Sequence, residues 1–142
     1  MKCSLICFNC QATHLYSYST KDLVCESCGS GIVDKEIRFL VFALNCYGIK
    51  TEKSCEGHDD FDSGYYPFPW LTILSEEDKE RLSSLINEYN LAIEGNSSQW
   101  RVGFNVEALR YWLYPQDKHK ETRILQEESK ILAKFIISKK GK

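Results

Sequence analysis

The chain has 142 residues, of which 43% are hydrophobic and 27% are charged, and its formal net charge is −2. This length suffices for one ordinary hydrophobic core with a small appendage. The weakly negative charge excludes a protein that binds nucleic acid through overall positive charge. No apolar run reaches the roughly twenty residues of a membrane helix, and no apolar signal segment is present near the N-terminus, so we expect a cytoplasmic protein with reduced thiols.

Four of the seven cysteines form two Cys-x-x-Cys pairs, which are separated by fourteen residues. Two residues between thiolates let one tight turn aim both sulfurs at a single ion, and the longer spacing lets a hairpin bring the second turn opposite the first. Gly29 follows the second pair, where a positive φ is often needed. The spacing predicts a closed structural zinc site, without an open coordination position for chemistry, whose ligands are Cys7, Cys10, Cys25 and Cys28.

Residues 3–30 resemble the zinc-ribbon family in this spacing. The resemblance implies a ribbon domain over residues 1–33, followed by a second domain over residues 34–142. Redox dithiols and iron–sulfur ligation are the alternatives that the spacing leaves open. Cys3 adds a Cys-x-x-x-Cys-x-x-Cys triplet typical of radical-SAM enzymes, but those enzymes need a much larger barrel, so we interpret Cys3 as a spare thiol or an alternative ligand.

After the ribbon, residues 34–47 are expected to form a helix that Asp34 caps and whose apolar positions follow a 3.6-residue period. Gly48 and Ile49 should end this helix with a left-handed glycine and a hydrophobic contact. Strands are expected at residues 50–54 and 67–74, with a polar loop over residues 55–66 between them.

The second half of the chain begins with a pattern like a capping box, Ser75-Glu76-Glu77-Asp78, which predicts a helix over the apolar stripe from Leu82 to Tyr89. A turn at residues 95–98 precedes a strand over residues 100–106. Residues 109–114 are expected to return as its hairpin partner, with a short helix as the alternative, and residues 120–138 form the last helix. The order of ribbon and then αββαββα predicts a mixed α+β layer fold.

A second cluster of chemically active side chains lies at the end of the first predicted strand. We expect residues 54–60 to form a ligand-binding loop, because strand ends that open into loops are where sites are commonly built. Gly57 would let backbone N–H groups approach an anion closely. The expected ligand-binding residues are Ser54, Cys55, Glu56, Gly57 and His58.

Cys55 and His58 have three further interpretations. They form a nucleophile with its base, although the acids Glu56, Asp59 and Asp60 would raise the thiol pKa and so oppose this chemistry. They hold a second metal ion together with Asp59 or Asp60. Alternatively, they are a half-buried thiol and a surface imidazole without a function.

This loop also carries two resemblances. The run "LN..GI.T..SCEGH" over residues 44–58, followed by a proline-aromatic strand at residues 67–73, resembles a motif in small bacterial and phage proteins. The shorter core, Thr51-x-x-Ser54-Cys55-x-Gly57, is similar to a segment of the tRNA wybutosine-synthesis methyltransferase family. That family usually has an arginine after the glycine, where this chain has His58. The resemblances imply a functional loop without naming a reaction.

Aromatic and basic residues complete the functional pattern. Residues 118–142 contain eight Lys and Arg against three Glu, which predicts either phosphate contacts or a solvated helix face. Eight aromatic residues on the predicted strands or beside them form either a platform for stacking bases or part of the core: Tyr65, Tyr66, Phe68, Trp70, Trp100, Tyr111, Trp112 and Tyr114. We therefore expect a zinc-binding protein that recognises nucleic acid or a nucleotide-like ligand through residues 54–60. A small enzyme using Cys55 and His58, or a module that binds a protein partner, is the alternative.

Overall fold

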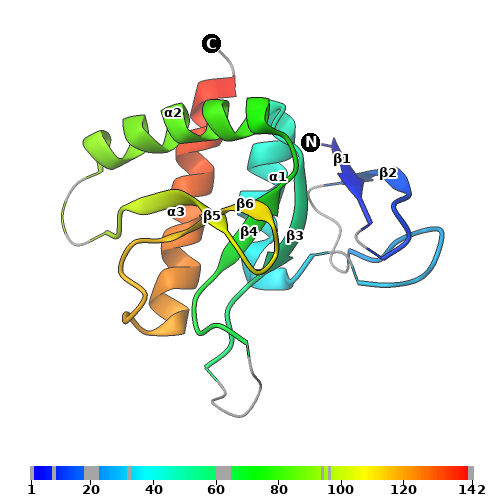
Figure 1. The fold of residues 1–142 in the computed structure, drawn as a ribbon, viewed down its shortest axis with the longest axis horizontal. Helices are drawn as coiled ribbons and strands as arrows, with labels where there is room; N and C mark the ends of the chain where they lie inside the picture. The colour runs from blue at the N-terminus through cyan, green and yellow to red at the C-terminus, as the bar shows by residue number, and fades with distance from the viewer. Residues whose placement is uncertain are drawn as a thin grey trace.

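The computed structural model describes residues 2–7, 9–17, 23–31, 33–59, 65–93, 95 and 97–140, and its element order confirms the predicted α+β fold (Figure 1). Among the described helices, none is long and apolar enough to cross a membrane. In chain order the elements are β1 (Lys2–Ile6), β2 (Thr13–Ser17), the short 3-10 helix η1 (Lys35–Ile37), α1 (Arg38–Tyr47), β3 (Thr51–Cys55), β4 (Trp70–Ile73), α2 (Glu76–Ala92), β5 (Trp100–Asn105), β6 (Arg110–Pro115) and α3 (Thr122–Lys140).

The N-terminal hairpin pairs β1 with β2 in antiparallel register, from Lys2 opposite Ser17 to Ile6 opposite Thr13. It lies beside α1, at the right of Figure 1. Three buried side chains from the hairpin and the segment after it, Leu5, Tyr16 and Leu23, share one hydrophobic core with the helices and the second sheet. The N-terminal part of the chain is therefore packed onto the rest through apolar contacts.

The second sheet is fully antiparallel and has the strand order β3-β4-β6-β5. Side chains alternate between its two faces, so residues of one parity share a face. Helical residues pack against the face that carries Leu71, Ile73 and Leu113, which are fully buried. The opposite face carries Trp70, Thr72, Trp112 and Tyr114, and the site described below is built on it.

The first helix begins differently from the prediction. Asp34 makes no capping hydrogen bond; residues 35–37 form η1, and α1 begins at Arg38. The backbone N–H of Glu36 instead donates to the Glu56 carboxylate at 3.0 Å. The predicted end of the helix is confirmed: Gly48 has φ +103°, and the N–H of Ile49 donates to the Leu44 carbonyl at 2.9 Å, as in a Schellman motif.

The strand boundaries also differ in part. The predicted strand 67–74 is shortened to β4, since Pro67 and Pro69 have no N–H to donate to a ladder. Residues 110–115 form the hairpin strand β6, which excludes the alternative of a short helix. The predicted cap of the second helix is confirmed, because the Ser75 hydroxyl accepts the N–H of Asp78 at 3.0 Å.

A buried carboxylate fixes the two loops that flank α3 and β5. Glu128 of α3 is 5% exposed and accepts hydrogen bonds from the Ser98 backbone N–H at 2.5 Å and from the Lys120 ammonium at 2.8 Å. Charge-assisted hydrogen bonds of this kind are strong when the carboxylate is buried. Glu128 thus ties the segment before β5 and the β6–α3 loop to the same helix.

Candidate functional site

The four predicted metal ligands come together at the end of the N-terminal hairpin. The sulfurs of Cys7, Cys10, Cys25 and Cys28 all lie within 4.8 Å of one another. Cys7 and Cys28 are 3.7 Å apart, and Cys10 and Cys25 are 3.6 Å apart, close to the edge of about 3.8 Å expected for a tetrahedron with metal–sulfur bonds of about 2.3 Å. All four are free thiols, so the cluster can hold a metal ion.

The two cysteine turns have the same backbone hydrogen bonds, as a site with two equivalent halves requires. In the first turn the Gln11 N–H donates to the Cys7 carbonyl at 2.8 Å, and in the second the Gly29 N–H donates to the Cys25 carbonyl at 2.9 Å. Gly29 has φ +79°, which confirms the prediction from its position, and Gln11 has φ +66°. Sequence reasoning missed Gln11, although it occupies the position after Cys10 that corresponds to Gly29.

The thiols of Cys28 and Cys10 differ strongly in pKa. A hydrogen bond from the Ser30 hydroxyl, helped by the Ser30 and Asn9 N–H donors, lowers the pKa of Cys28 to about 6. The Ala12 N–H lowers the pKa of Cys10, but desolvation and the neighbouring cysteines together raise it to about 12. Such close sulfurs cannot all be thiolates without a cation between them, whereas a bound metal ion stabilises all four.

The remaining cysteines lie away from this cluster. Cys46 is on α1, and its sulfur lies 4.0 Å from the Lys2 carbonyl oxygen. The backbone of Cys3 belongs to β1, opposite Tyr16, and its side chain lies outside the described ones. Cys55 ends β3 and is considered with its loop.

The predicted ligand loop donates its backbone N–H groups within the protein. The Glu56 N–H donates to Asp34 Oδ2 at 3.1 Å, and the His58 N–H donates to the Tyr66 carbonyl at 3.0 Å. The Gly57 N–H is hydrogen-bonded to the Cys55 sulfur. These three N–H groups are therefore used within the protein. A ligand of this loop would have to be bound by side chains and not by these backbone N–H groups.

Gly57 has a structural role that explains its presence. Its φ is +90°, and a Cβ atom at this position would lie 2.8 Å from the Phe68 carbonyl carbon and 3.1 Å from the Pro69 nitrogen. The absence of a side chain lets the loop pack directly against the segment that precedes β4. Ser54, in the strand before it, pairs with Leu71.

The structure brings Asp34, which the sequence did not connect with this loop, to Cys55 and His58. One ligand atom from each of these three residues lies within 4.8 Å of the others. Cys55 is 5% exposed; burial, followed by the charges of Asp34 and Glu56, raises its pKa despite the Gly57 N–H. A buried thiol with a raised pKa is a poor nucleophile. Asp59 is exposed, and Asp60, named in the same prediction, lies outside the described residues.

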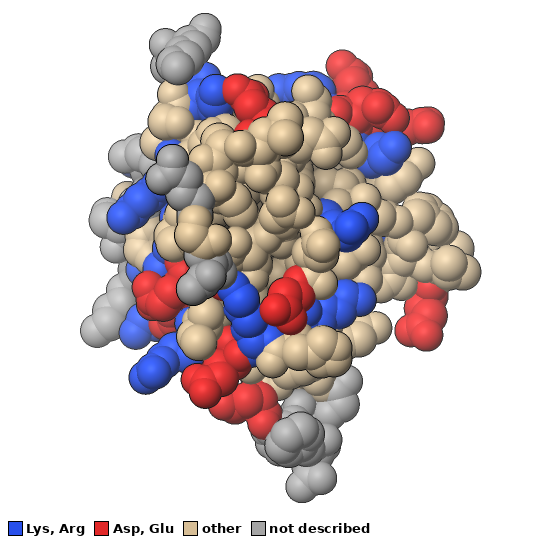
Figure 2. Space-filling model, turned by 90° about the vertical axis from the view of Figure 1, so that its left-hand side faces the viewer, with Lys and Arg blue, Asp and Glu red and all other residues tan. Residues whose placement is uncertain are grey.

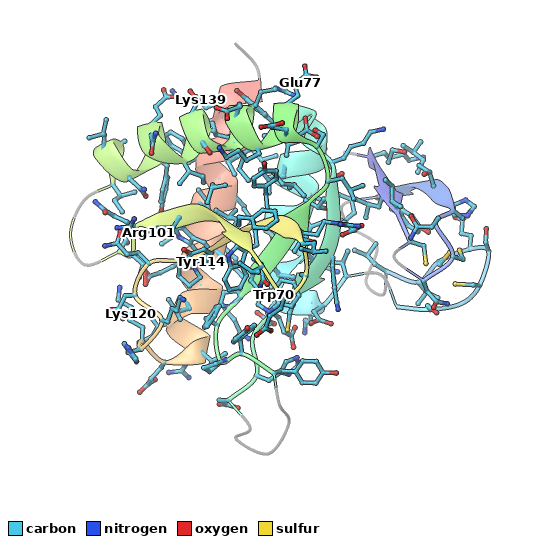
Figure 3. The ribbon with its side chains drawn as sticks, in the orientation of Figure 1. Trp70, Glu77, Arg101, Tyr114, Lys120 and Lys139 are labelled. Carbon is cyan, nitrogen blue, oxygen red and sulfur yellow. The ribbon has the colours of Figure 1, made fainter. Side chains whose placement is uncertain are left out.

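Five aromatic rings cluster at the sheet face opposite the helices: Trp70, Trp112 and Tyr114 on β4 and β6, and Tyr66 and the buried Phe68 on the segment before β4. Trp112 is at their centre: its ring centroid lies 4.5 Å from that of Tyr114, 5.8 Å from Tyr66, 6.2 Å from Phe68 and 6.4 Å from Trp70. Tyr66 and Phe68 are stacked at 5.0 Å. We call these five residues the aromatic face; Trp70 and Tyr114 are labelled in Figure 3.

The predicted platform is therefore divided between the two faces of the sheet. Trp100 is 1% exposed in the core, and Tyr111 packs against that core. Tyr65 lies beside the loop, where its ring is 4.9 Å from the His58 ring. The alternation of side chains along β6 predicts part of this division, because Trp112 and Tyr114 point to one face of the sheet and Tyr111 points to the other.

One cavity is lined by residues of the aromatic face, and a second lies at the loop beside it. The first, of about 280 Å³, is lined by Trp70, Trp112, Thr72, Lys53 and Arg110, among others. The indole Nε1 of Trp70 is buried without a hydrogen-bond partner in the described part of the chain, which is unusual for a native structure. The second, of about 640 Å³, runs between the predicted loop and the β6–α3 loop and includes His58, Lys118 and Arg123.

Cations lie at the margin of the aromatic face. The Lys118 ammonium lies 4.8 Å from the Tyr114 ring centroid, 5.5 Å from that of Phe68 and 5.7 Å from that of Trp112. Arg101 is exposed and lies opposite Tyr114 in the ladder. Figure 2 shows the side of the molecule at the left of Figure 1, where lysine and arginine side chains are interspersed with acidic ones, so positive charge is not concentrated on that side.

Comparison with known proteins does not place the chain in a family. No protein-family model matches it, and no significant match is found among curated proteins or solved structures. The α+β fold, the four-cysteine cluster and the aromatic face are thus the observations from which a function has to be inferred.

Proposed function

We propose that this protein holds structural zinc in its ribbon and binds single-stranded nucleic acid, or a nucleotide, by stacking bases on the aromatic face. The four-thiol donor set supports zinc, because closed four-cysteine sites of this spacing and geometry favour that metal. The observation that carries the second part is the five-ring cluster centred on Trp112 on the sheet face that the helices leave uncovered.

Stacking suits this surface better than recognition through charge. Bases offer flat π-faces that aromatic side chains on an antiparallel sheet can cover, and the binding is tolerant of sequence. Gly103 supports this use of β5: a Cβ there would lie 3.3 Å from the Tyr114 hydroxyl, so glycine leaves the rings of Tyr114 and Trp112 less covered. Lys118 and Arg101 are placed to meet phosphates at the margin.

The predicted loop contacts the backbone of the residues that carry part of the aromatic face. Cys55 pairs with Trp70 across the ladder, Gly57 packs on the Phe68 backbone, and the His58 N–H donates to the Tyr66 carbonyl. In this proposal residues 54–59 position the segment that carries Tyr66 and Phe68, and His58 does so through its backbone N–H. Ser54, Cys55, Glu56 and Gly57 act through this positioning.

The test is a titration of fluorescently labelled single-stranded and double-stranded oligonucleotides, followed by anisotropy at several salt concentrations. Trp112→Ala is expected to weaken single-strand binding by about fivefold to 150-fold, since base–aromatic stacking contributes about 1–3 kcal/mol per base. The salt dependence should correspond to about one or two phosphate contacts, because few cations flank the face.

Two variants control for loss of folding. Phe104→Ala removes an exposed ring from the neighbouring strand on the other face of the sheet and should leave affinity unchanged. Trp112→Phe keeps a ring at the central position and should restore part of the affinity. No binding by the wild-type protein at low salt, or equal affinity for Trp112→Ala and Phe104→Ala, would overturn the proposal.

A further inference from the structure

We propose that Asp34, Cys55 and His58 form a second metal site, which takes a divalent cation of the zinc type and leaves one coordination position open. The three residues reach the site from different elements: Asp34 precedes η1, Cys55 ends β3, and His58 lies in the following loop. Their ligand atoms converge to within 4.8 Å of one another. This site is separate from the ribbon and does not depend on nucleic-acid binding.

The donor set selects the metal class. A thiolate, an imidazole and a carboxylate are all ligands that zinc accepts, and three protein ligands with a fourth position for water or another oxygen donor are typical of zinc sites that do chemistry. Magnesium and calcium prefer oxygen donors alone, so a buried thiol disfavours them. The negative charges of Asp34 and Cys55 would balance the charge of the ion.

Neighbouring groups hold two of the ligands in place, as the outer shell of a metal site does. The Glu56 N–H donates to Asp34 Oδ2 at 3.1 Å and thereby fixes the carboxylate. The Gly57 N–H is directed at the Cys55 sulfur. The positive φ of Gly57, which glycine adopts without strain, therefore serves a local geometry that places a thiolate, a carboxylate and an imidazole together.

The open position would face the larger of the two cavities. His58 lines this cavity together with Asp59, Lys118 and His119, whereas Cys55 does not line it and is 5% exposed. A fourth ligand would thus enter from the cavity side, where an anionic oxygen would also meet Lys118. The buried sulfur and the accessible imidazole give the site an inner and an outer side.

The experiment is a zinc count on the full-length protein after dialysis against a zinc buffer, together with cobalt substitution. The wild-type protein is expected to hold about two zinc ions per chain, and His58→Ala about one. His119→Ala is the matched control: it removes another imidazole that lines the same cavity and should keep both ions.

Asp34→Asn gives a second variant that keeps the hydrogen-bond acceptor for Glu56 while removing the charge, and its second zinc should bind more weakly. In the cobalt-substituted protein, the absorption spectrum of His58→Ala is subtracted from that of the wild type. The difference should show sulfur-to-cobalt charge transfer from one thiolate, which is weaker than that of the four-thiolate site. One zinc per chain in both wild type and His58→Ala, or two in both, would overturn the proposal.

Discussion

Replacing Cys25 with serine is expected to abolish metal binding at the ribbon and to unfold residues 2–31 while the larger domain stays folded. Cys25 is 2% exposed, its sulfur lies 3.6 Å from that of Cys10, and its turn is closed by the Gly29 N–H. Structural zinc contributes about 10–16 kcal/mol to the folding of small zinc domains. Hairpin strands of five residues do not retain their structure without such a contribution.

Metal content and limited proteolysis measure this effect. The Cys25→Ser protein should lose the ribbon metal, and protease should cut within its first 33 residues and leave a resistant fragment that contains the four-stranded sheet. Ser27→Ala is the control, because it alters the same turn without removing a ligand and should keep both the metal and the protection. A Cys25→Ser protein that retains the metal and resists protease like wild type would contradict the assignment of the four cysteines as ligands.

Gly57→Ala is expected to be the most destabilising single substitution in the predicted loop, by about 3 kcal/mol or more. An alanine at φ +90° is strained, and its Cβ would in addition meet the Phe68 carbonyl carbon at 2.8 Å. The Phe68 carbon belongs to the backbone, so the clash cannot be relieved by a side-chain rotation. The loop and the segment preceding β4 would have to separate.

Gly95→Ala separates the two contributions. Gly95 has φ +73°, and nothing lies within 4 Å of a Cβ there, so this variant carries the backbone strain without the clash. It should lose about 1 kcal/mol. Urea unfolding followed by tryptophan fluorescence gives the free energy of unfolding for both, and equal losses would show that the loop does not pack as described.

The sequence predicted the fold and the ribbon because both depend on short-range patterns. The paired cysteines lie on single turns, and the apolar periodicity of α1, α2 and α3 repeats within a few residues. The helix start at Asp34 was the clearest error. Its carboxylate is drawn to the Glu56 N–H, twenty-two residues away in the chain, and local capping rules contain no information about such a partner.

The same reason limits prediction of the functional surfaces. Cys55 and His58 were recognised from their adjacency, but the acid that joins them comes from before η1 and not from Asp59. The aromatic residues were recognised as a group, whereas their division into core and open face depends on the register of β4 and β6 and on which face the helices cover. These are properties of tertiary packing.

The predicted loop and the aromatic face share backbone contacts, and two substitutions distinguish their roles. Gly57 and His58 hold the backbone of Phe68 and Tyr66, so Gly57→Ala should impair both stability and ligand binding. Removing the His58 imidazole leaves these backbone contacts in place. His58→Ala therefore changes metal content while the aromatic face keeps its geometry.

Photo-crosslinking of a 4-thiouridine oligonucleotide, with the adducts mapped by mass spectrometry, tests most directly whether bases stack on the sheet. The account predicts adducts on the aromatic face, at Tyr66, Trp112 and Tyr114, with competition by unlabelled single strands. Adducts confined to α3 and its lysines, or adducts distributed over the surface without competition, would contradict it.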